Sequence, residues 1–390
     1  MDRLVSVEAQ KTILEGPSYS IFINSLKTKA TKSRYSKTLE DFAKWKGAKS
    51  LDDLLVGDQK SLSASIIEYI KKLETDGLSY SSRSNAFSAI RHFYEMNYVV
   101  LAWKKIYGSV GEFERKYDNT RPYTHEEIAK LLSIADLKYR AMILLMCSSG
   151  IRVGAIPDIK YSHLEKMLGY DIYKIHIYKK SKEKYYTFCT PEAYTAINEY
   201  LGQRKGLGEI ITNDTPLFRT DPNTDSRIRT KSLHKIKHPS PLRYSAIKTR
   251  FYNMSQKCGL LKAQKTSTTN KLGVRRNELQ MIHGFRKFFA TQLENSDIGG
   301  FHNEALMGHA VGLRAIYRVT PEKRLMEYAK ALPNLTIDQS QKLELENTEL
   351  KQKNAEIESL KAKINSMQQT QDQLTELSKK LYEAGILKKD

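Results

Sequence analysis

Apolar residues recur every three or four positions through the first quarter of the chain, which is the spacing of one helix face. This spacing predicts helices over residues 31–45, 61–73 and 81–96, and a short apolar turn at 51–55. Residues 19–108 are therefore expected to form a compact bundle of about four helices. An N-terminal extension at 1–18 precedes the bundle.

A second domain is expected at 122–336, after a charged linker at 109–121 that has no clear period. Thr124 is placed to cap its first helix, and Glu127 follows three residues later, as a capping box requires. Apolar spacing predicts the helices of this domain over residues 126–135, 137–148, 191–201, 244–258, 283–295 and 300–307.

Two short segments of the second domain follow the alternating pattern of strands instead. Residues 170–178 read YDIYKIHIY, and 185–188 form a second β-like run. The polar stretch KKSKEK at 179–184 separates them and predicts a hairpin turn. The expected fold class is therefore mainly α with a small antiparallel β-sheet.

The tail at 337–390 has a different pattern, without Gly or Pro between Pro333 and Gly385. Apolar residues occupy the a and d positions of a heptad repeat: Leu343, Leu350, Ile357, Ile364, Leu360, Met367, Leu374 and Leu381. The first two d positions, Glu346 and Lys353, are polar, so the repeat is weak at its start. We expect a coiled coil that promotes self-association; the alternative is one amphipathic helix that packs on the protein.

The chain carries 64 Lys and Arg against 44 Asp and Glu, a formal net charge of +20. Such basicity indicates a polyanionic partner, which DNA, RNA or an anionic membrane surface would satisfy. No apolar run approaches the ~20 residues that span a bilayer, and the first ten residues lack the apolar core of a secretory signal. Nucleic acid is therefore the expected partner. The tail from Asp338 holds nine Lys and ten Asp or Glu, so the positive charge lies before it.

The three cysteines, Cys147, Cys189 and Cys258, are odd in number and far apart. They suggest neither a disulfide framework nor a metal-binding spacing. We interpret them as reduced thiols of a cytoplasmic, nucleoid-associated protein.

Four short segments of the second domain carry residues suited to phosphate chemistry. They are SSGIR, the lysine-rich turn, HGFR and LMGH, and a tyrosine stands eight residues after the last of these. Their candidate residues are Arg152, Lys179, His283, Arg286, His309 and Tyr317.

Together these residue types would supply every role in the metal-free exchange of a phosphodiester. Two arginines clamp the anionic oxygens, a lysine or histidine protonates the leaving hydroxyl, and a phenol attacks phosphorus. Each residue alone has an ordinary reading, such as a surface arginine, a satisfied histidine or a half-buried tyrosine ring. Their ordered combination favours the chemical reading, and we expect no metal or cofactor.

In these motifs the region from Pro122 to Asn334 resembles the catalytic domain of tyrosine recombinases, the integrase family. SSGIR is similar to the family's first-arginine motif, HGFR to its His-x-x-Arg motif, and LMGH to its Gly-His motif. The stretches GAIPDI and YRVTPEKRLMEYAKALPNLTI look like archaeal and archaeal mobile-element members. The resemblance implies a helical core-binding domain, an α+β catalytic domain and a clamp around double-stranded DNA.

The resemblance also implies a role for each motif residue. Arg152 and Arg286 would bind the scissile phosphate, and His309 would donate a hydrogen bond to one of its oxygens. His283 would assist proton transfer, and Tyr317 would form a 3′-phosphotyrosyl bond.

The general acid for the leaving 5′-oxygen would be Lys179, with Lys180 and Lys182 as close competitors in the same turn.

Two departures from the family pattern concern the same motifs. Ala155 stands where many members carry an acidic residue, and Tyr317 follows His309 by eight residues rather than nine. A loop could absorb the shift of one residue. Otherwise Tyr328 would be the nucleophile.

Further basic residues are candidates for phosphate contacts, which position DNA without reading its sequence. In the second domain these are Arg227, Arg229, Lys231, Lys235 and Lys237. In the first domain they are Lys32, Arg34, Arg83 and Arg91. The alternative reading is a solvated basic surface.

The sequence therefore predicts a site-specific DNA recombinase with integrase or excisionase activity, encoded by a mobile genetic element. It would act on paired DNA sites as a homo-oligomer, a dimer to a tetramer, helped by the coiled coil at 343–381. One alternative is a type IB topoisomerase, which shares the chemistry. The other is a non-catalytic architectural DNA-binding protein on the same fold.

Overall fold

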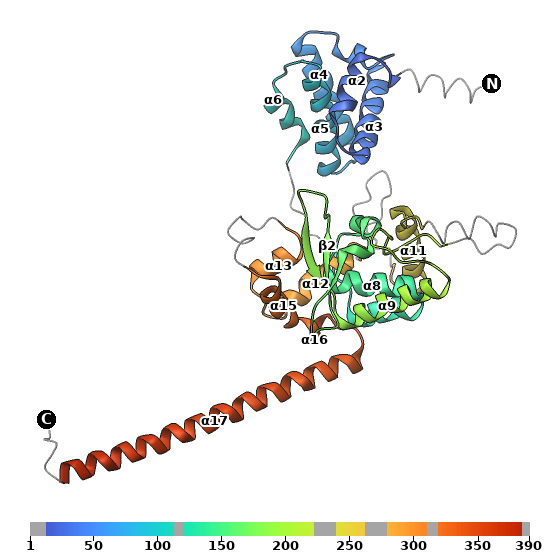
Figure 1. Ribbon diagram of the computed structural model, residues 1–390. Coiled ribbons are helices and arrows are strands. Elements are labelled where there is room, and N and C mark those ends of the chain that lie inside the picture. The colour runs from blue at the N-terminus through green and yellow to red at the C-terminus, as the bar shows by residue number, and fades with distance from the viewer. Residues whose placement is uncertain (1–12, 113–119, 222–238, 262–278, 310–318, 384–390) are drawn as a thin grey trace. The chain divides into compact units, whose positions relative to one another are not determined.

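The computed structural model describes residues 13–112, 120–221, 239–261, 279–309 and 319–383. They form two compact units, one ending before Thr120 and one beginning there. Both units are mainly helical, and the second holds a three-stranded antiparallel sheet, so the predicted fold class is confirmed (Figure 1).

The first unit is a helical bundle built around a buried aromatic core. Its elements are α2 (Pro17–Ser25), α3 (Lys29–Lys46), η1 (Asp52–Leu55), α4 (Gln59–Thr75), α5 (Tyr80–Met96), α6 (Trp103–Tyr107) and η2 (Gly108–Val110). Thr28, Asp58 and Ser79 cap α3, α4 and α5 through their side-chain oxygens. The three long helices agree with the predicted ones, and α2 and α6 were not among the predicted helices.

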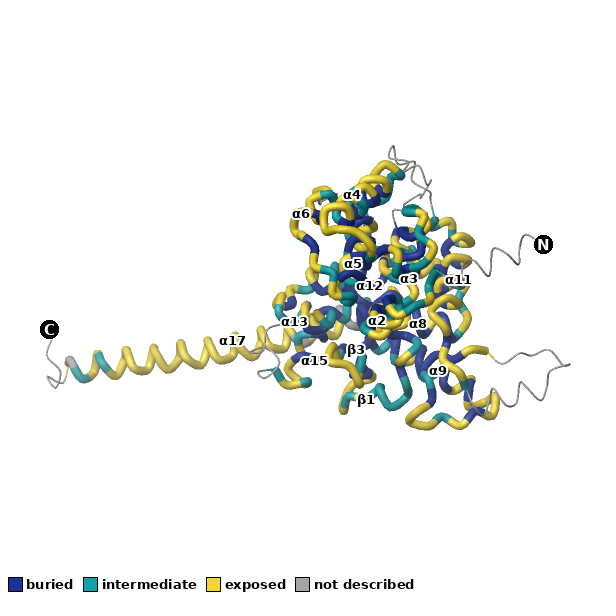
Figure 2. The backbone as a smooth tube through the Cα atoms, turned by 90° about the horizontal axis from the view of Figure 1, so that it is seen from above, coloured by how far each residue is buried: buried dark blue, intermediate teal, exposed yellow. Residues whose placement is uncertain are grey.

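The second unit surrounds α8, the helix that it buries most completely. Its helices are α7 (His125–Ser133), α8 (Leu137–Ser149), η3 (Val153–Asp158), η4 (Tyr161–His163), α9 (Pro191–Gly206), α11 (Tyr244–Lys257), α12 (His283–Glu294), α13 (Gly300–Leu306), α15 (Pro321–Ala329) and α16 (Leu332–Leu335). Figure 2 shows α8 in dark blue for buried residues. The predicted capping box is present at the N-terminus of α7. The Thr124 amide donates to the Glu127 carboxylate at 3.0 Å, and the Glu127 amide donates to Thr124 Oγ1 at 3.3 Å.

The sheet of the second unit has the strand order β1-β2-β3, with β1 (Leu164–Lys166), β2 (Tyr173–Ile177) and β3 (Tyr185–Phe188). Ile177 pairs with Tyr185, so the segment between β2 and β3 is the predicted hairpin turn. Strand β1 was not predicted, because three residues are too few to show alternation.

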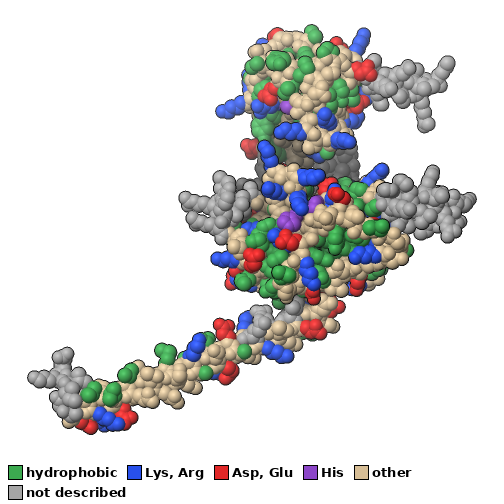
Figure 3. Space-filling model, viewed as in Figure 1, with side chains coloured by type: hydrophobic (Ala, Val, Ile, Leu, Met, Phe, Trp, Pro, Cys, Tyr) green, Lys and Arg blue, Asp and Glu red, His purple; other side chains and the backbone are tan. Residues whose placement is uncertain are grey.

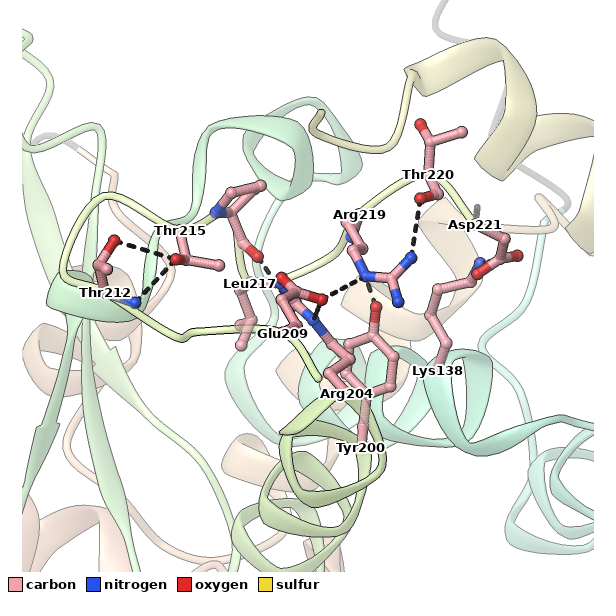
Figure 4. Close-up of polar contacts among 11 residues, drawn as sticks. Lys138, Tyr200, Arg204, Glu209, Thr212, Thr215, Leu217, Arg219, Thr220 and Asp221 are labelled. Carbon is pink, nitrogen blue, oxygen red and sulfur yellow. Dashed lines mark hydrogen bonds and ion pairs between the residues drawn. The ribbon is translucent and has the colours of Figure 1, made fainter. Parts of the chain in front are cut away.

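A buried ion cluster fixes the chain after α9 (Figure 4). Glu209 lies between two arginines and pairs with both Arg204 and Arg219, the latter at 2.6 Å. All three side chains are almost fully buried. Arg204 Nη1 also donates to the carbonyl of Leu217 at 2.7 Å. The cluster therefore gives a hydrogen-bond partner to a buried backbone carbonyl as well as pairing its own charges. The cluster therefore adds to the apolar packing of loop and helix, where the rings of Tyr200 and Phe218 stack at 5.9 Å.

The tail forms one helix, α17 (Gln339–Glu383), as the heptad pattern predicted. Its apolar side chains are exposed and appear at intervals along α17 in Figure 3. The exposed set is Leu343, Leu350, Ile357, Leu360, Ile364, Met367, Leu374 and Leu377. Self-association through this face stays a prediction. Within the described residues, no helix is long and apolar enough to cross a membrane.

Candidate active site

Arg286 joins three separate elements of the second unit. It lies on α12 and is only 5% exposed. Its Nη1 donates to the carbonyl of Gly150, and its Nη2 donates to the carbonyl of Met307 at 2.7 Å. The same Nη2 lies 2.9 Å from Nε2 of His309. The end of α8, the first turn of α12 and the turn after α13 therefore meet at one guanidinium.

Arg152 reaches the same place from the end of α8. Gly150 ends that helix at φ 58°, and a Cβ there would come within 2.2 Å of the Phe289 ring. Glycine thus permits both the left-handed turn and the close packing of α8 on α12. Arg152 follows two residues later and is exposed.

The two arginines act on each other electrostatically. Burial lowers the pKa of Arg286, and the positive charge of Arg152 lowers it further. In the described chain the hydrogen-bond partners of Arg286 are two carbonyl oxygens and an imidazole, none of which carries negative charge. Two close guanidinium groups without a carboxylate on Arg286 form a site that favours an anion.

His309 is held between Arg286 and an acidic residue. Its Nδ1 lies 2.5 Å from Oε2 of Glu304, on the side of the ring opposite the arginine. Gly308 precedes it at φ 66°, and a Cβ on Gly308 would come within 2.5 Å of the Tyr185 ring. The turn after α13 therefore requires glycine both for its backbone and for its contact with β3.

His283 is the first residue of α12 and is exposed. It precedes Arg286 by three positions, so the two residues share one helix face. The HGFR motif thus places a histidine and an arginine along the same edge of the site.

The three candidate lysines lie in the turn between β2 and β3 and are all exposed. Lys179 is near His163: burial first, and then the Lys179 charge, lower the pKa of that histidine. Lys180 contributes in a minor way to the lowered pKa of Asp214, whose main cause is its bond to Lys160. Within the described chain, none of the three makes a hydrogen bond to Arg286, and the choice among Lys179, Lys180 and Lys182 stays open.

Tyr317 lies outside the described residues, whereas Tyr328, the alternative nucleophile, lies within them. Tyr328 is fully buried, and its hydroxyl donates to the carbonyl of Ser148 at 2.7 Å. Burial raises the pKa of this phenol well above the usual range. A buried, hydrogen-bonded and protonated phenol has no access to DNA, so the alternative nucleophile Tyr328 is wrong.

Tyr185 is a residue of the site that sequence reasoning missed. Its hydroxyl is buried beside the guanidinium of Arg286. Burial raises the pKa of this phenol, and the charges of Arg286 and Arg152 oppose that rise. The sequence held no indication of this position, because Tyr185 is one of 23 tyrosines and appeared only as the start of a strand.

The basic residues predicted to contact DNA differ in their placement. Arg34 is exposed, Lys32 is half-buried, and Arg91 pairs with Glu95 at 2.7 Å. The residues Arg227, Arg229, Lys231, Lys235 and Lys237 lie outside the described residues.

Arg83 is turned inward in the first unit. It is buried, and its guanidinium donates to the carbonyls of Val110 and Leu78 at 3.0 and 2.9 Å. It also pairs with Glu74 at 3.0 Å. Its role is to hold the end of the bundle together, so Arg83 is not retained among the proposed DNA contacts.

Comparison with known proteins identifies part of the second unit. Residues 122–313 match the model of the phage integrase family. The matched stretch ends before Tyr317. It contains the other five candidate catalytic residues, Arg152, Lys179, His283, Arg286 and His309. A comparison with curated proteins finds no significant match.

Several solved structures are similar to the chain at low identity. The integrase of mycobacterium phage Brujita is 16% identical, with a TM-score of 0.37, over 82% of this chain and 96% of that one. A Tn1549 transposon integrase in complex with transposon right end DNA is 15% identical, with a TM-score of 0.49, over 80% and 98%. The XerH site-specific recombinase bound to palindromic difH substrate is 21% identical, with a TM-score of 0.49, over 76% and 78%.

Proposed function

We propose, from the premise that residues 122–313 form a phage integrase family domain, that this protein is a site-specific DNA recombinase. It cleaves one strand of double-stranded DNA, holds the 3′-phosphate as an ester of Tyr317, and rejoins it to a new 5′-hydroxyl. Integration or excision of a mobile element would be the outcome. The GAIPDI segment and the segment from Tyr317 to Ile337 support kinship with archaeal mobile elements.

The observation that carries this proposal is the contact of Arg286 with His309, within electrostatic range of Arg152. Arg286 is buried, oriented by two carbonyl oxygens and next to a second arginine charge. Fixed cationic donors stabilise the pentacovalent phosphate more than the ground state, because they need no reorganisation when charge develops.

The remaining steps involve protons. The Tyr317 phenol must lose a proton to attack phosphorus, and nearby cations favour its ionised form. The leaving 5′-oxygen must gain one, and a lysine of the turn at 179–184 supplies it, with Lys179 as our first choice. His283, on the same helix face as Arg286, would assist these transfers.

Recombination joins two DNA sites, so more than one protomer must act together. We propose that α17 helps to hold a dimer or tetramer through its exposed apolar face. The exposed Arg34 of the first unit would contact DNA phosphates on the same substrate. The DNA-bound protein would work in the cytoplasm, on the nucleoid.

A nicked duplex that carries the cognate site tests the proposal, because loss of the short cleaved strand traps the covalent complex. The expected result is a protein–DNA adduct that forms in the presence of a metal chelator and is abolished by Tyr317→Phe. An adduct that survives this change or requires Mg²⁺ would refute the mechanism. Relaxation of any supercoiled plasmid, without regard to sequence, would favour a topoisomerase, and binding without any adduct an architectural protein.

A further inference from the structure

Glu304, His309 and Arg286 form a continuous chain of hydrogen bonds. Oε2 of Glu304 lies 2.5 Å from Nδ1 of His309, and Nε2 of the same ring lies 2.9 Å from Nη2 of Arg286. Both nitrogens of the imidazole are thus engaged, one by an acid and the other by the buried arginine of the site.

The chemistry of the two neighbours assigns the proton on the ring. A guanidinium has only donors, so Nε2 must accept the hydrogen bond from Arg286. An ionised carboxylate has only acceptors, so Nδ1 must carry the hydrogen that Glu304 receives. A doubly protonated ring would set the Nε2 hydrogen against a hydrogen of Arg286. The arrangement therefore selects the neutral tautomer with the proton on Nδ1.

The backbone brings Glu304 and His309 together independently of their side chains. At the end of α13 the His309 amide donates to the Glu304 carbonyl at 3.0 Å, and the Gly308 amide donates to the Ala305 carbonyl at 3.1 Å. These two bonds, with Gly308 at φ 66°, form a Schellman motif. This motif places the residue five positions before His309 next to it, and in this chain that residue is Glu304.

The pair is too exposed to serve mainly as a stabilising ion pair. The His309 side chain is 39% exposed and the Glu304 side chain 56%. Exposed pairs contribute little to folding, since water screens their charges. What the contact does determine is the direction of the ring, because an unanchored imidazole would rotate and exchange tautomers.

We propose that Glu304 is a positioning residue for the strand-cleavage reaction, which holds the His309 ring and its tautomer so that Nε2 accepts from Arg286 and helps to orient that guanidinium toward the phosphate. In this tautomer His309 acts through Arg286 and does not itself donate to a phosphate oxygen. This inference rests on the proposed function. It adds to the site an acidic residue that none of the family motifs contains, five positions before the histidine and on the far side of its ring. An outer carboxylate that orients a working histidine is a recurring device in enzyme sites.

Two variants and a control separate orientation from charge. Glu304→Ala removes the anchor, whereas Glu304→Gln keeps an oxygen that accepts from Nδ1 but removes the negative charge. Glu294→Gln, at the exposed end of α12, is the matched control. Each full-length protein is tested for adduct formation on the nicked duplex in single turnover. The tautomer of His309 is read from its imidazole ¹⁵N shifts, with His309→Asn used for assignment.

The expected result is a protonated Nδ1 in the wild type and in Glu304→Gln, and a mixture of tautomers in Glu304→Ala. Adduct formation by Glu304→Ala should slow on the order of tenfold or more, with an unchanged melting temperature, while Glu294→Gln matches the wild type. Wild-type rates and unchanged ¹⁵N shifts in Glu304→Ala would overturn the inference. A wild type that forms no adduct would refute the proposed function instead, while the ¹⁵N shifts would still report on the geometry.

Discussion

Arg286 donates from one atom, Nη2, to both the carbonyl of Met307 and the Nε2 of His309, at 2.7 and 2.9 Å. The arginine of the HGFR motif therefore fixes the turn that carries the histidine of the LMGH motif. One guanidinium serves as part of the fold and, in the proposed function, as part of the phosphate site, so its loss should affect both.

Replacement of Arg286 by lysine should lower both stability and cleavage. The ammonium group cannot reach the carbonyls of Gly150 and Met307 at once, and a buried carbonyl without a partner costs about 1–3 kcal/mol. The anion site also loses its fixed fork, so adduct formation should fall about a hundredfold or more. Urea denaturation and single-turnover assays on the nicked duplex measure the two effects. Unchanged stability with lost cleavage would show that the backbone contacts of Arg286 do not hold the fold.

Gly308→Ala should destabilise the protein by about 1–3 kcal/mol. The new methyl group would meet the Tyr185 ring at 2.5 Å, and the left-handed backbone at φ 66° disfavours any side chain. Gly202→Ala, within α9, is the control, because nothing lies within 4 Å of its Cβ position. That change should raise stability by up to about 1 kcal/mol. Equal urea midpoints for the two variants would contradict the close packing of β3 on the turn.

Glu209→Gln should be among the most destabilising single changes in the second unit. It leaves the buried charges of Arg204 and Arg219 without their shared carboxylate, and breaking such a pair costs about 3–5 kcal/mol. Glu199→Gln, an exposed position on α9, should change the free energy of unfolding very little. Similar melting temperatures for both variants would mean that the cluster is not buried in solution.

Glu192 should give the protein a pH dependence of its own. Its carboxylate accepts from the Ile337 amide at 2.9 Å, and burial raises the pKa above the ordinary 4.5. At a pH below 4.5 the Glu192 carboxyl is protonated in both the folded and the unfolded protein. At a pH above its folded pKa it is ionised in both, and burying the charged carboxylate then destabilises the folded protein. Its stabilising contribution is therefore lost as pH rises through the folded pKa.

The difference in unfolding free energy between the wild type and Glu192→Gln isolates this group from other titrations. Relative to the variant, the wild type should lose stability as pH rises above 4.5. A difference that stays constant across this range, or that grows in favour of the wild type, would contradict the raised pKa.

The exposed face of α17 should hold protomers together. Lysine at both Ile357 and Ile364 places charge at two adjacent a positions and should convert an oligomer to a monomer in sedimentation of the full-length protein. The control is Lys351→Glu with Glu358→Lys, which lie at exposed b positions away from the apolar face and should leave the oligomer intact. A wild type that sediments as a monomer at high concentration would refute assembly through this helix.

The sequence predicted those parts that depend on local pattern. Helices α8 and α12 and the hairpin turn followed from spacing and from residue type. The contacts of Arg286 with Gly150 and Met307 could not be predicted, because they join segments far apart in the chain. Arg83 shows the converse error: a basic residue on a polar face was expected outside, yet its guanidinium satisfies carbonyls within the bundle.

Mapping the covalent bond between protein and DNA shows directly which residue is the nucleophile. The trapped adduct is digested with nuclease and protease, and mass spectrometry locates the residue that carries the nucleotide. We expect a 3′-phosphate esterified to Tyr317 and no modified peptide from Tyr317→Phe. A nucleotide on any other residue, or a bond through a 5′-phosphate, would contradict it.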